Sequence, residues 1–229
     1  MLISIIIPVF NEQKTVIEIL KRVNKQKIRE VRFEIIVVND GSTDGTIGLL
    51  KKNKDLYNKL INLSKNRGKG AAIKQGIGAA KGSYILFQDG DLEYDPADYK
   101  NLFEPIIRFN ADVVLGSRLL GPPITRVSYF WNKQGNKVIT LLFNIFYNTT
   151  FTDIYSCYLV FKRELLVANT LKTEGWEQQA EILSKVVLNS RRHYEVPVNY
   201  YGRSYDEGKK IRPYHIFKII FTIMYKRFF

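Results

Sequence analysis

The stretch "FEIIVVNDGSTDGT", residues 33–46, joins a short apolar run to a turn rich in glycine and polar residues. The run is rich in β-branched residues and too short for a buried helix, so it predicts a buried strand. The glycines give the turn backbone freedom, and Ser42 or Thr43 is placed to cap a helix that we expect over about residues 43–54. A strand, a turn and a helix in this order favour a parallel β-α-β arrangement.

The same alternation recurs along the first half of the chain, and it loosens beyond residue 120. We expect further strands within 2–10, 59–65, 83–90, 111–118, 158–165 and 193–202. Helices are expected within 11–26, 69–80, 138–147, 177–189 and 214–229, with another between the strands at 83–90 and 111–118. Strands that alternate with helices of this length predict an α/β fold with a Rossmann-like, doubly wound, mostly parallel sheet. We interpret the whole as one domain in two lobes.

The composition favours a folded protein with an anionic partner. Hydrophobic residues make up 45% of the 229 residues, and the net charge of +13 favours nucleic acid, an anionic membrane surface or a phosphorylated substrate. Cys157 is the single cysteine, which excludes an intrachain disulfide, fits a reducing compartment and is interpreted as a small core residue. The start "MLISIIIPVF" does not resemble a signal peptide, and no apolar stretch reaches the ~20 residues that span a bilayer.

Polar clusters follow four of the expected strands. They read "PVFNE", "NDGSTDGT", "QDGDLEYDP" and "GSR". Ligands of an open parallel sheet bind beyond the carboxyl ends of the strands, so these clusters should meet at one edge. This convergence predicts a binding site, with the carboxylate of Asp40 accepting hydrogen bonds from a base or a ribose.

The segment "QDGDLEYDP", residues 88–96, contains the most concentrated negative charge of a basic chain. Asp89 and Asp91 flank a glycine at the end of a buried strand, and such carboxylate oxygens suit Mg²⁺ or Mn²⁺ together with substrate phosphates. No histidine lies nearby in the sequence, which disfavours zinc. Asp95 is placed to cap the helix that starts after Pro96.

The glycine-rich segment "NRGKGAAIKQGIGAAKG", residues 66–82, matches neither a P-loop nor a dinucleotide-binding fingerprint. The first needs a different spacing, and both belong after the first strand of their fold. The simpler interpretation places Arg67 and Lys69 near phosphates, with Gly68 and Gly70 permitting a close approach. A plain surface turn explains the segment equally well.

Taken in order, "IIPVFNE", "VVNDGSTDGT" and "QDGD" resemble family 2 glycosyltransferases of the GT-A fold. The segments "NRGKGAA", "VVLGSR", "TDIYSCYLVFKREL" and "YEVPVNYYGRSYDEGKK" resemble in particular the dolichyl- and polyprenyl-phosphate sugar synthases. The resemblance implies a catalytic domain over 1–210, with a nucleotide-sugar half (about 1–120) and an acceptor-side half (about 121–210). Residues 211–229 would form an amphipathic membrane-interface tail.

The resemblance also implies roles for individual residues. The nucleotide sugar would be bound by Pro8, Phe10, Glu12, Asp40, Lys69, Asp89, Gln179 and Glu181. The metal ion would be held by Asp89 and Asp91, with Glu93 as a third ligand. The acceptor phosphate would be met by Arg118, Arg126 and Lys209, and the catalytic set would be Asp91, Arg118 and Arg203. Gly90 stands where the mannose synthases of the family carry an alanine, and the choice between a UDP- and a GDP-linked donor stays open.

The implied reaction is an inverting transfer of a hexose to a polyprenyl or dolichyl phosphate. An ionised lipid phosphate needs positioning cations rather than a base, whereas a saccharide or protein hydroxyl would need a carboxylate base such as Asp153. A nucleotidyltransferase also uses paired carboxylates and a metal. A nucleic-acid-binding module rests on charge alone and matches no known motif, so we expect no nucleic-acid partner.

The apolar segments "KVITLLFNIFY" and "YHIFKIIFTIMYKRFF" combine aromatic residues with Lys and Arg. That composition is typical of helices that lie in a membrane interface, although the first segment would serve equally well as a core helix. We therefore expect a peripheral enzyme on the cytoplasmic face of a membrane. The oligomeric state does not follow from the sequence.

Overall fold

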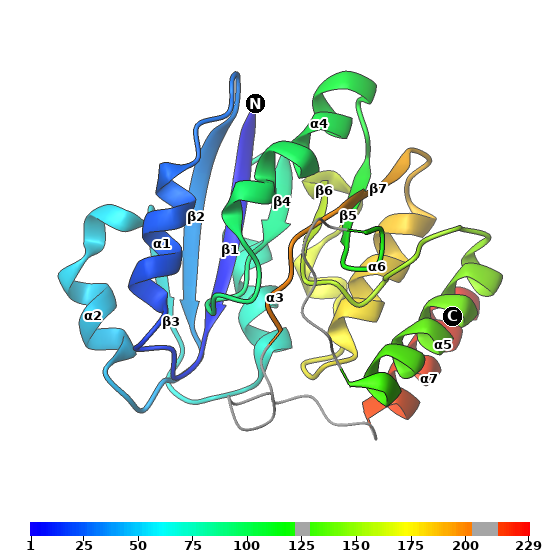
Figure 1. Ribbon diagram of the computed structural model, residues 1–229. Coiled ribbons are helices and arrows are strands. Elements are labelled where there is room, and N and C mark those ends of the chain that lie inside the picture. The colour runs from blue at the N-terminus through cyan, green and yellow to red at the C-terminus, as the bar shows by residue number, and fades with distance from the viewer. Residues whose placement is uncertain (122–128, 203–214) are drawn as a thin grey trace.

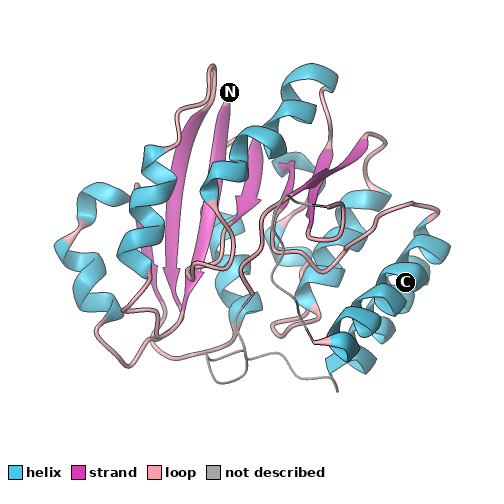
Figure 2. Ribbon diagram, viewed as in Figure 1, coloured by secondary structure: helices cyan, strands magenta, loops and turns pink. Residues whose placement is uncertain are grey.

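The computed structural model describes residues 1–121, 129–202 and 215–229. Seven strands form one sheet in the order β3-β2-β1-β4-β6-β5-β7, with helices on both faces (Figure 1, Figure 2). The strands are β1 Leu2–Val9, β2 Arg32–Asn39, β3 Lys59–Asn62, β4 Tyr84–Phe87, β5 Val113–Ser117, β6 Leu159–Lys162 and β7 His193–Pro197. Each lies within a predicted strand segment, except that β2 begins one residue earlier, at Arg32, so the predicted α/β class is confirmed.

The strand directions explain where a site can form. Strands β1, β2, β3 and β4 are mutually parallel, β5 is parallel to β7, and β6 runs antiparallel between β4 and β5. The parallel half places the residues that follow β1, β2 and β4 at one edge of the sheet. Because helices cover both faces, β1 can be apolar almost throughout, and residues 3–7 are all buried.

The helices form a layer on each face of the sheet. Their bounds are α1 Val16–Lys25, α2 Thr46–Lys52, α3 Lys69–Ala79, α4 Tyr99–Phe109, α5 Phe130–Tyr147, α6 Gln178–Leu188 and α7 His215–Phe228, with short 3₁₀ turns η1 Lys54–Leu56, η2 Pro96–Asp98, η3 Arg163–Leu165 and η4 Ala168–Thr170. Helices α1 and α4 cover one face, and α3 and α6 cover the other (Figure 1). All the helices expected from spacing are therefore present, with shifted ends.

The capping predictions had different outcomes. The side chain of Asp95 accepts a hydrogen bond from the Ala97 amide at 3.0 Å, as predicted for the start of η2. The prediction for α2 was wrong, because Asp44 Oδ1 accepts from the Thr46 amide at 2.9 Å. Ser42 and Thr43 face the preceding loop instead, where Ser42 Oγ accepts from the Asn11 amide.

The last helix, α7, packs beside α5 on the side of the molecule far from α1 and α2 (Figure 1). Ile219 and Ile223 are buried in this contact, and the Tyr147 hydroxyl donates to the Ile223 carbonyl at 3.0 Å. No helix in the described ranges is long and apolar enough to cross a membrane.

Candidate active site

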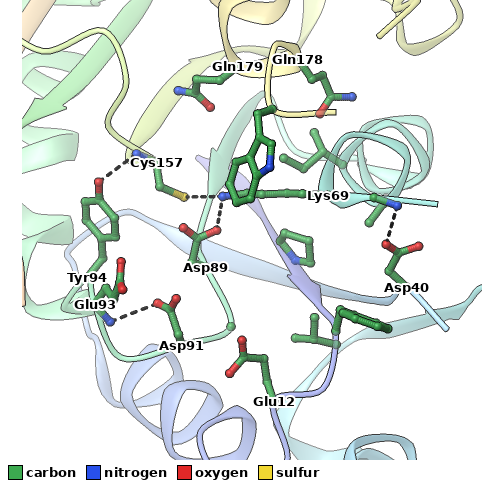
Figure 3. Close-up of a pocket in the computed structure, with 18 of the residues that line it drawn as sticks. Glu12, Asp40, Lys69, Asp89, Asp91, Glu93, Tyr94, Cys157, Gln178 and Gln179 are labelled. Atoms are coloured by element: carbon green, nitrogen blue, oxygen red, sulfur yellow. Dashed lines mark hydrogen bonds and ion pairs between the residues drawn. The ribbon is translucent and has the colours of Figure 1, made fainter. Parts of the chain in front are cut away.

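A cavity of about 420 Å³ opens at the carboxyl ends of β1, β2 and β4. The predicted site residues that line it are Pro8, Phe10, Glu12, Asp40, Lys69, Asp89, Asp91, Glu93, Arg118 and Gln179. Figure 3 shows that Asp40 stands on one side of this cavity and that Asp91 and Glu93 stand on the other. Residues as far apart in the sequence as Pro8 and Gln179 therefore meet here, and the clusters that follow β1, β2, β4 and β5 meet as the strand pattern predicted. Arg126, Arg203 and Lys209 lie outside the described residues.

Asp40, which directly follows β2, is held by backbone amides. Its two carboxylate oxygens accept hydrogen bonds from the amides of Arg67 and Gly68, both at 2.9 Å. Burial raises the pKa of Asp40 above its ordinary value, and these amide hydrogen bonds oppose the rise. Asp40 thus positions the glycine-rich loop that begins α3, besides bordering the cavity.

Lys69, the first residue of α3, points at the first of the clustered aspartates. Its Nζ forms an ion pair with Asp89 and lies 3.8 Å from the Sγ of Cys157 (Figure 3). Although burial opposes the charged form, Asp89 holds the pKa of Lys69 above its ordinary value. The glycine-rich segment therefore places a cation beside the acidic cluster, and this ion pair joins the two predicted motifs.

Gly90 allows the acidic turn to approach β1 closely. A Cβ at this position would lie 2.6 Å from Cγ1 of Val9 and 3.2 Å from the carbonyl oxygen of Pro8. The turn is also tied to α1, because Thr15 Oγ1 donates to the Gly90 carbonyl at 3.0 Å and to Glu12 Oε2 at 2.9 Å. The two aspartates are consequently fixed against the end of β1.

The predicted third metal ligand, Glu93, does not join the pair. The Tyr200 hydroxyl donates to Glu93 Oε2 at 3.0 Å, while Asp91 Oδ1 accepts from the Glu93 amide at 3.1 Å. Nowhere in the described part of the chain do three His, Cys, Asp or Glu side chains gather closely enough to hold a metal ion. Glu93 borders the same cavity but is engaged by Tyr200, so its role as a third ligand stays a prediction, whereas Asp89 and Asp91 are the two aspartates of the turn that face the cavity.

Arg118 follows β5 and borders the cavity while pairing with a buried carboxylate. Its Nε and Nη2 donate to Asp153 at 2.7 and 2.8 Å, and its guanidinium carbon lies 5.0 Å from the centre of the Tyr200 ring. The Asp153 side chain is fully buried and also accepts from Asn136 at 2.6 Å. Although burial alone would raise it, Arg118 holds the pKa of Asp153 below its ordinary value. Asp153 is thus a partner of Arg118 and does not line the cavity, which disfavours it as the base that a hydroxyl acceptor would need.

Glu181 lies away from the cavity, in contrast to Gln179 on the same helix. Two positions along a helix are turned by about 200°, so these side chains face opposite ways. The Glu181 carboxylate is fully buried, pairs with Lys226 of α7 at 2.8 Å and accepts from the Thr173 amide at 2.8 Å. The prediction that Glu181 contacts the donor is therefore wrong in this structure.

Several lining residues were not assigned to the site from the sequence. Cys157 is buried as predicted but borders the cavity, and so do the side chains of Tyr94, Trp176, Gln178 and Tyr200. Tyr94 belongs to the acidic segment, and its hydroxyl accepts from the Cys157 amide at 3.1 Å. The aromatic residues in "DLEYDP" and "NYYG" were visible signals, but spacing alone did not distinguish them from core residues.

Solved structures with a similar overall fold include GT-A glycosyltransferases. Glucosyl-3-phosphoglycerate synthase from Mycobacterium tuberculosis, in complex with Mn²⁺, UDP and phosphoglyceric acid, matches with a TM-score of 0.70 and 18% identity. The match covers 99% of this chain and 78% of that one. TarS of S. aureus in complex with UDP-GlcNAc matches with a TM-score of 0.65 and 22% identity, over 99% and 66% of the two chains. These likenesses establish the fold class, which was predicted.

The sequence comparisons identify the family. The model of glycosyl transferase family 2 matches residues 4–168, and the chain therefore belongs to that family. Glycosyltransferase AglJ of Haloferax volcanii is 27% identical over 98% of this chain and 71% of its own length. Dolichyl-phosphate beta-glucosyltransferase of Dictyostelium discoideum is 28% identical over 93% and 69%. Dodecaprenyl-phosphate galacturonate synthase of Rhizobium johnstonii is 34% identical over 51% of this chain and 36% of its own length.

Proposed function

We propose that this protein transfers a hexose from a UDP- or GDP-linked sugar to a polyprenyl or dolichyl phosphate, with inversion at the anomeric carbon. The observation that carries the proposal is the cavity at the carboxyl edge of the sheet, where Asp40, Lys69, Asp89 and Asp91 converge. Family membership supports a glycosyltransferase, and the names of two relatives point to lipid phosphates as acceptors.

The pair Asp89 and Asp91 fits a divalent cation such as Mg²⁺ or Mn²⁺. Both carboxylates border the cavity, and they offer only oxygen atoms as metal ligands. Asp89 already pairs with a cation, the ammonium group of Lys69. Two carboxylates plus substrate phosphates are a common arrangement for Mg²⁺. The ion would neutralise charge on the leaving diphosphate. Lys69, in the same place, would add a second positive charge toward that group.

Transfer to a lipid phosphate needs no protein base, because the acceptor phosphate is already ionised. An oxygen of the ionised acceptor phosphate forms the bond to the anomeric carbon, and the bond from that carbon to the diphosphate oxygen breaks. The diphosphate leaves with the electron pair, so no proton has to move. Arg118 at the rim of the cavity would position the acceptor phosphate, since guanidinium groups pair well with phosphate oxygens. Arg126, Arg203 and Lys209 are proposed for the same task.

The outer faces of α5 and α7 are proposed to rest on the membrane that holds the lipid acceptor. Exposed apolar side chains recur at helical spacing on α5 (Val138, Leu141, Ile145) and on α7 (Phe217, Phe221, Met224, Phe228). The two helices pack side by side, so their apolar stripes belong to one part of the surface (Figure 1). Apolar faces flanked by cations bind at lipid interfaces, and the net charge of +13 would favour anionic headgroups.

The test is donor consumption with UDP-glucose, GDP-mannose and UDP-N-acetylglucosamine, each with Mg²⁺ or Mn²⁺ and a short polyprenyl phosphate. We expect sugar from one donor to enter the organic phase, and both EDTA and the variant Asp91→Ala to abolish this. If a nucleoside diphosphate is released only with a saccharide or protein hydroxyl acceptor, the protein is still a glycosyltransferase, but its acceptor is not a lipid phosphate. Turnover of no donor with any acceptor would contradict the proposal.

A further inference from the structure

The segment between η4 and α6, residues 171–177, forms one wall of the cavity and is called the wall loop below. Gly175 and Trp176 of this loop line the cavity. The wall loop is tied to the start of α3, because the Gly70 amide donates to the Glu174 carbonyl at 3.0 Å. Arg67 Nη2 also pairs with Glu174 at 2.5 Å. Movement of the wall loop would therefore shift the residues that precede and follow Lys69.

A buried carboxylate, Glu181, binds the wall loop on the side away from the cavity. Glu181 accepts hydrogen bonds from the amides of Lys172 and Thr173 at 3.0 and 2.8 Å, and from Thr173 Oγ1 at 2.7 Å. Its side chain is fully buried, so it exchanges these partners for water only if the local packing opens. Glu181 therefore anchors the middle of the wall loop, while Lys74 Nζ donates to the Leu171 carbonyl at 2.7 Å and the Tyr155 hydroxyl donates to the Trp176 carbonyl.

The remaining partner of this carboxylate comes from the C-terminal helix. Lys226 Nζ of α7 pairs with Glu181 Oε1 at 2.8 Å, and the Lys226 side chain is only 10% exposed. Hydrogen bonds from Lys226 and Thr173 hold the pKa of Glu181 below its ordinary value, although burial alone would raise it. A buried carboxylate that loses its cation is strongly destabilised in place. The position of Glu181 consequently depends on the seating of α7.

We propose that Lys226 and Glu181 are positioning residues that couple the seating of α7 to the wall of the donor site. The contacts run from Lys226 through Glu181 to Lys172 and Thr173, and then through Glu174 to Gly70. The inference rests on the proposed function in one respect, namely that a nucleotide occupies this cavity. Helix α7 also carries the apolar stripe proposed to contact the membrane. A change in how α7 packs would therefore alter the position of the wall loop through these contacts.

The first test compares Lys226→Met with the wild-type protein, without lipid. We expect faster hydrogen exchange of the Lys172 and Thr173 amides, and a Kd for UDP or GDP with Mn²⁺ weakened about fivefold, within the usual range for coupling mutations. Lys218→Met is the matched control, because Lys218 is an exposed cation on the same helix. It should leave both readouts unchanged.

Further variants separate coupling from a loss of stability. In Lys226→Met/Glu181→Gln the buried charge is removed with its partner, so we expect loop protection and nucleotide Kd to return to within about twofold of wild type, as for a pair that acts together. Thr173→Val leaves α7 intact and removes one donor to Glu181, so it should loosen the wall loop even if Lys226→Met fails to fold.

A lower melting temperature for Lys226→Met with unchanged exchange in the wall loop and unchanged Kd would overturn the proposal. Unchanged exchange in Thr173→Val would overturn it as well. If the wild-type protein binds neither nucleotide, the proposed function loses its support, while the exchange of the Lys172 and Thr173 amides still decides the coupling.

Discussion

Two pairs of carboxylates in this molecule have similar chemistry and different surroundings. Asp89 and Asp91 border the cavity, and Asp89 is paired with Lys69, whose side chain is partly exposed. Asp153 and Glu181 are fully buried, and each is paired with a cation fixed by packing. A carboxylate that is buried with a permanent cationic partner therefore has a structural role. A carboxylate at the cavity can exchange its cation and thereby serve a ligand.

The largest expected effect comes from breaking a buried pair. Arg118→Met would leave the Asp153 carboxylate without its cation, and such losses cost about 3–5 kcal/mol. Denaturant unfolding should show this decrease in the free energy of unfolding. Arg118→Met/Asp153→Leu should recover part of it, because both charges are then absent. A stability of Arg118→Met equal to that of the wild-type protein would contradict the structural role of the pair.

The next effect concerns the cavity pair and should appear in activity. Asp91→Asn removes a charge from the donor site and should lower kcat/KM by about 10²-fold or more, the size expected for a lost electrostatic contact in a transition state. Its free energy of unfolding should fall by less than that of Arg118→Met, because Asn keeps an oxygen that can accept from the Glu93 amide. A large loss of stability in Asp91→Asn would erase the distinction between the two pairs.

Asp112 is a further paired carboxylate, and its contribution to stability should depend on pH. It pairs with Lys162 at 2.8 Å and with Arg192 at 3.1 Å, next to the start of β5. Burial opposes ionisation, but these partners hold the pKa of Asp112 well below its ordinary value. A lowered folded-state pKa gives stability that is present above the unfolded-state pKa and is lost as the pH falls toward the folded-state pKa.

Asp112→Asn should therefore cost about 1.5–3 kcal/mol at pH 7, the range for hydrogen bonds to charged groups. The difference from the wild-type protein should shrink as the pH falls from about 5 to about 2. Unfolding curves measured across this range test it. A difference that stays constant with pH would show that packing, rather than charge, accounts for the loss.

The smallest effect is steric and lies within the acidic turn. Gly90→Ala places a methyl group 2.6 Å from Cγ1 of Val9, and overpacking of this kind costs about 1–3 kcal/mol. Gly90→Ala/Val9→Ala should regain most of the loss, because it removes the clashing methyl groups. Thermal unfolding of the single and double variants measures both changes. Full stability of Gly90→Ala alone would mean that the turn is not held against β1.

The first half of the chain could be predicted well, because local pattern and global fold agree there. Each polar cluster follows an apolar strand, and parallel strands bring their carboxyl ends together whatever lies between them. Asp40, Asp89 and Asp91 were located in this way. Even here the ion pair of Lys69 with Asp89 did not follow from the sequence, since it depends on the path of the loop after β3.

The second half was harder, because the partners of its polar residues lie far away in the sequence. Helical spacing shows which face a residue occupies, but it does not show what packs on that face. The resemblance placed Glu181 at the donor, whereas its partner in the structure is Lys226, 45 positions later. Asp153 was considered as a base for a hydroxyl acceptor, and its partner Arg118 lies 35 positions earlier. The antiparallel strand β6 likewise has no signature that distinguishes it from a parallel one.

The most direct measurement of the central claim is calorimetric titration of the purified protein with UDP and with GDP, with Mn²⁺ or with EDTA. The account predicts that one nucleotide binds, that EDTA weakens binding at least tenfold, and that Asp89→Asn/Asp91→Asn does the same with its fold intact. Nucleotide binding that is indifferent both to EDTA and to the loss of these two carboxylates would contradict the claim that they form the metal and diphosphate site.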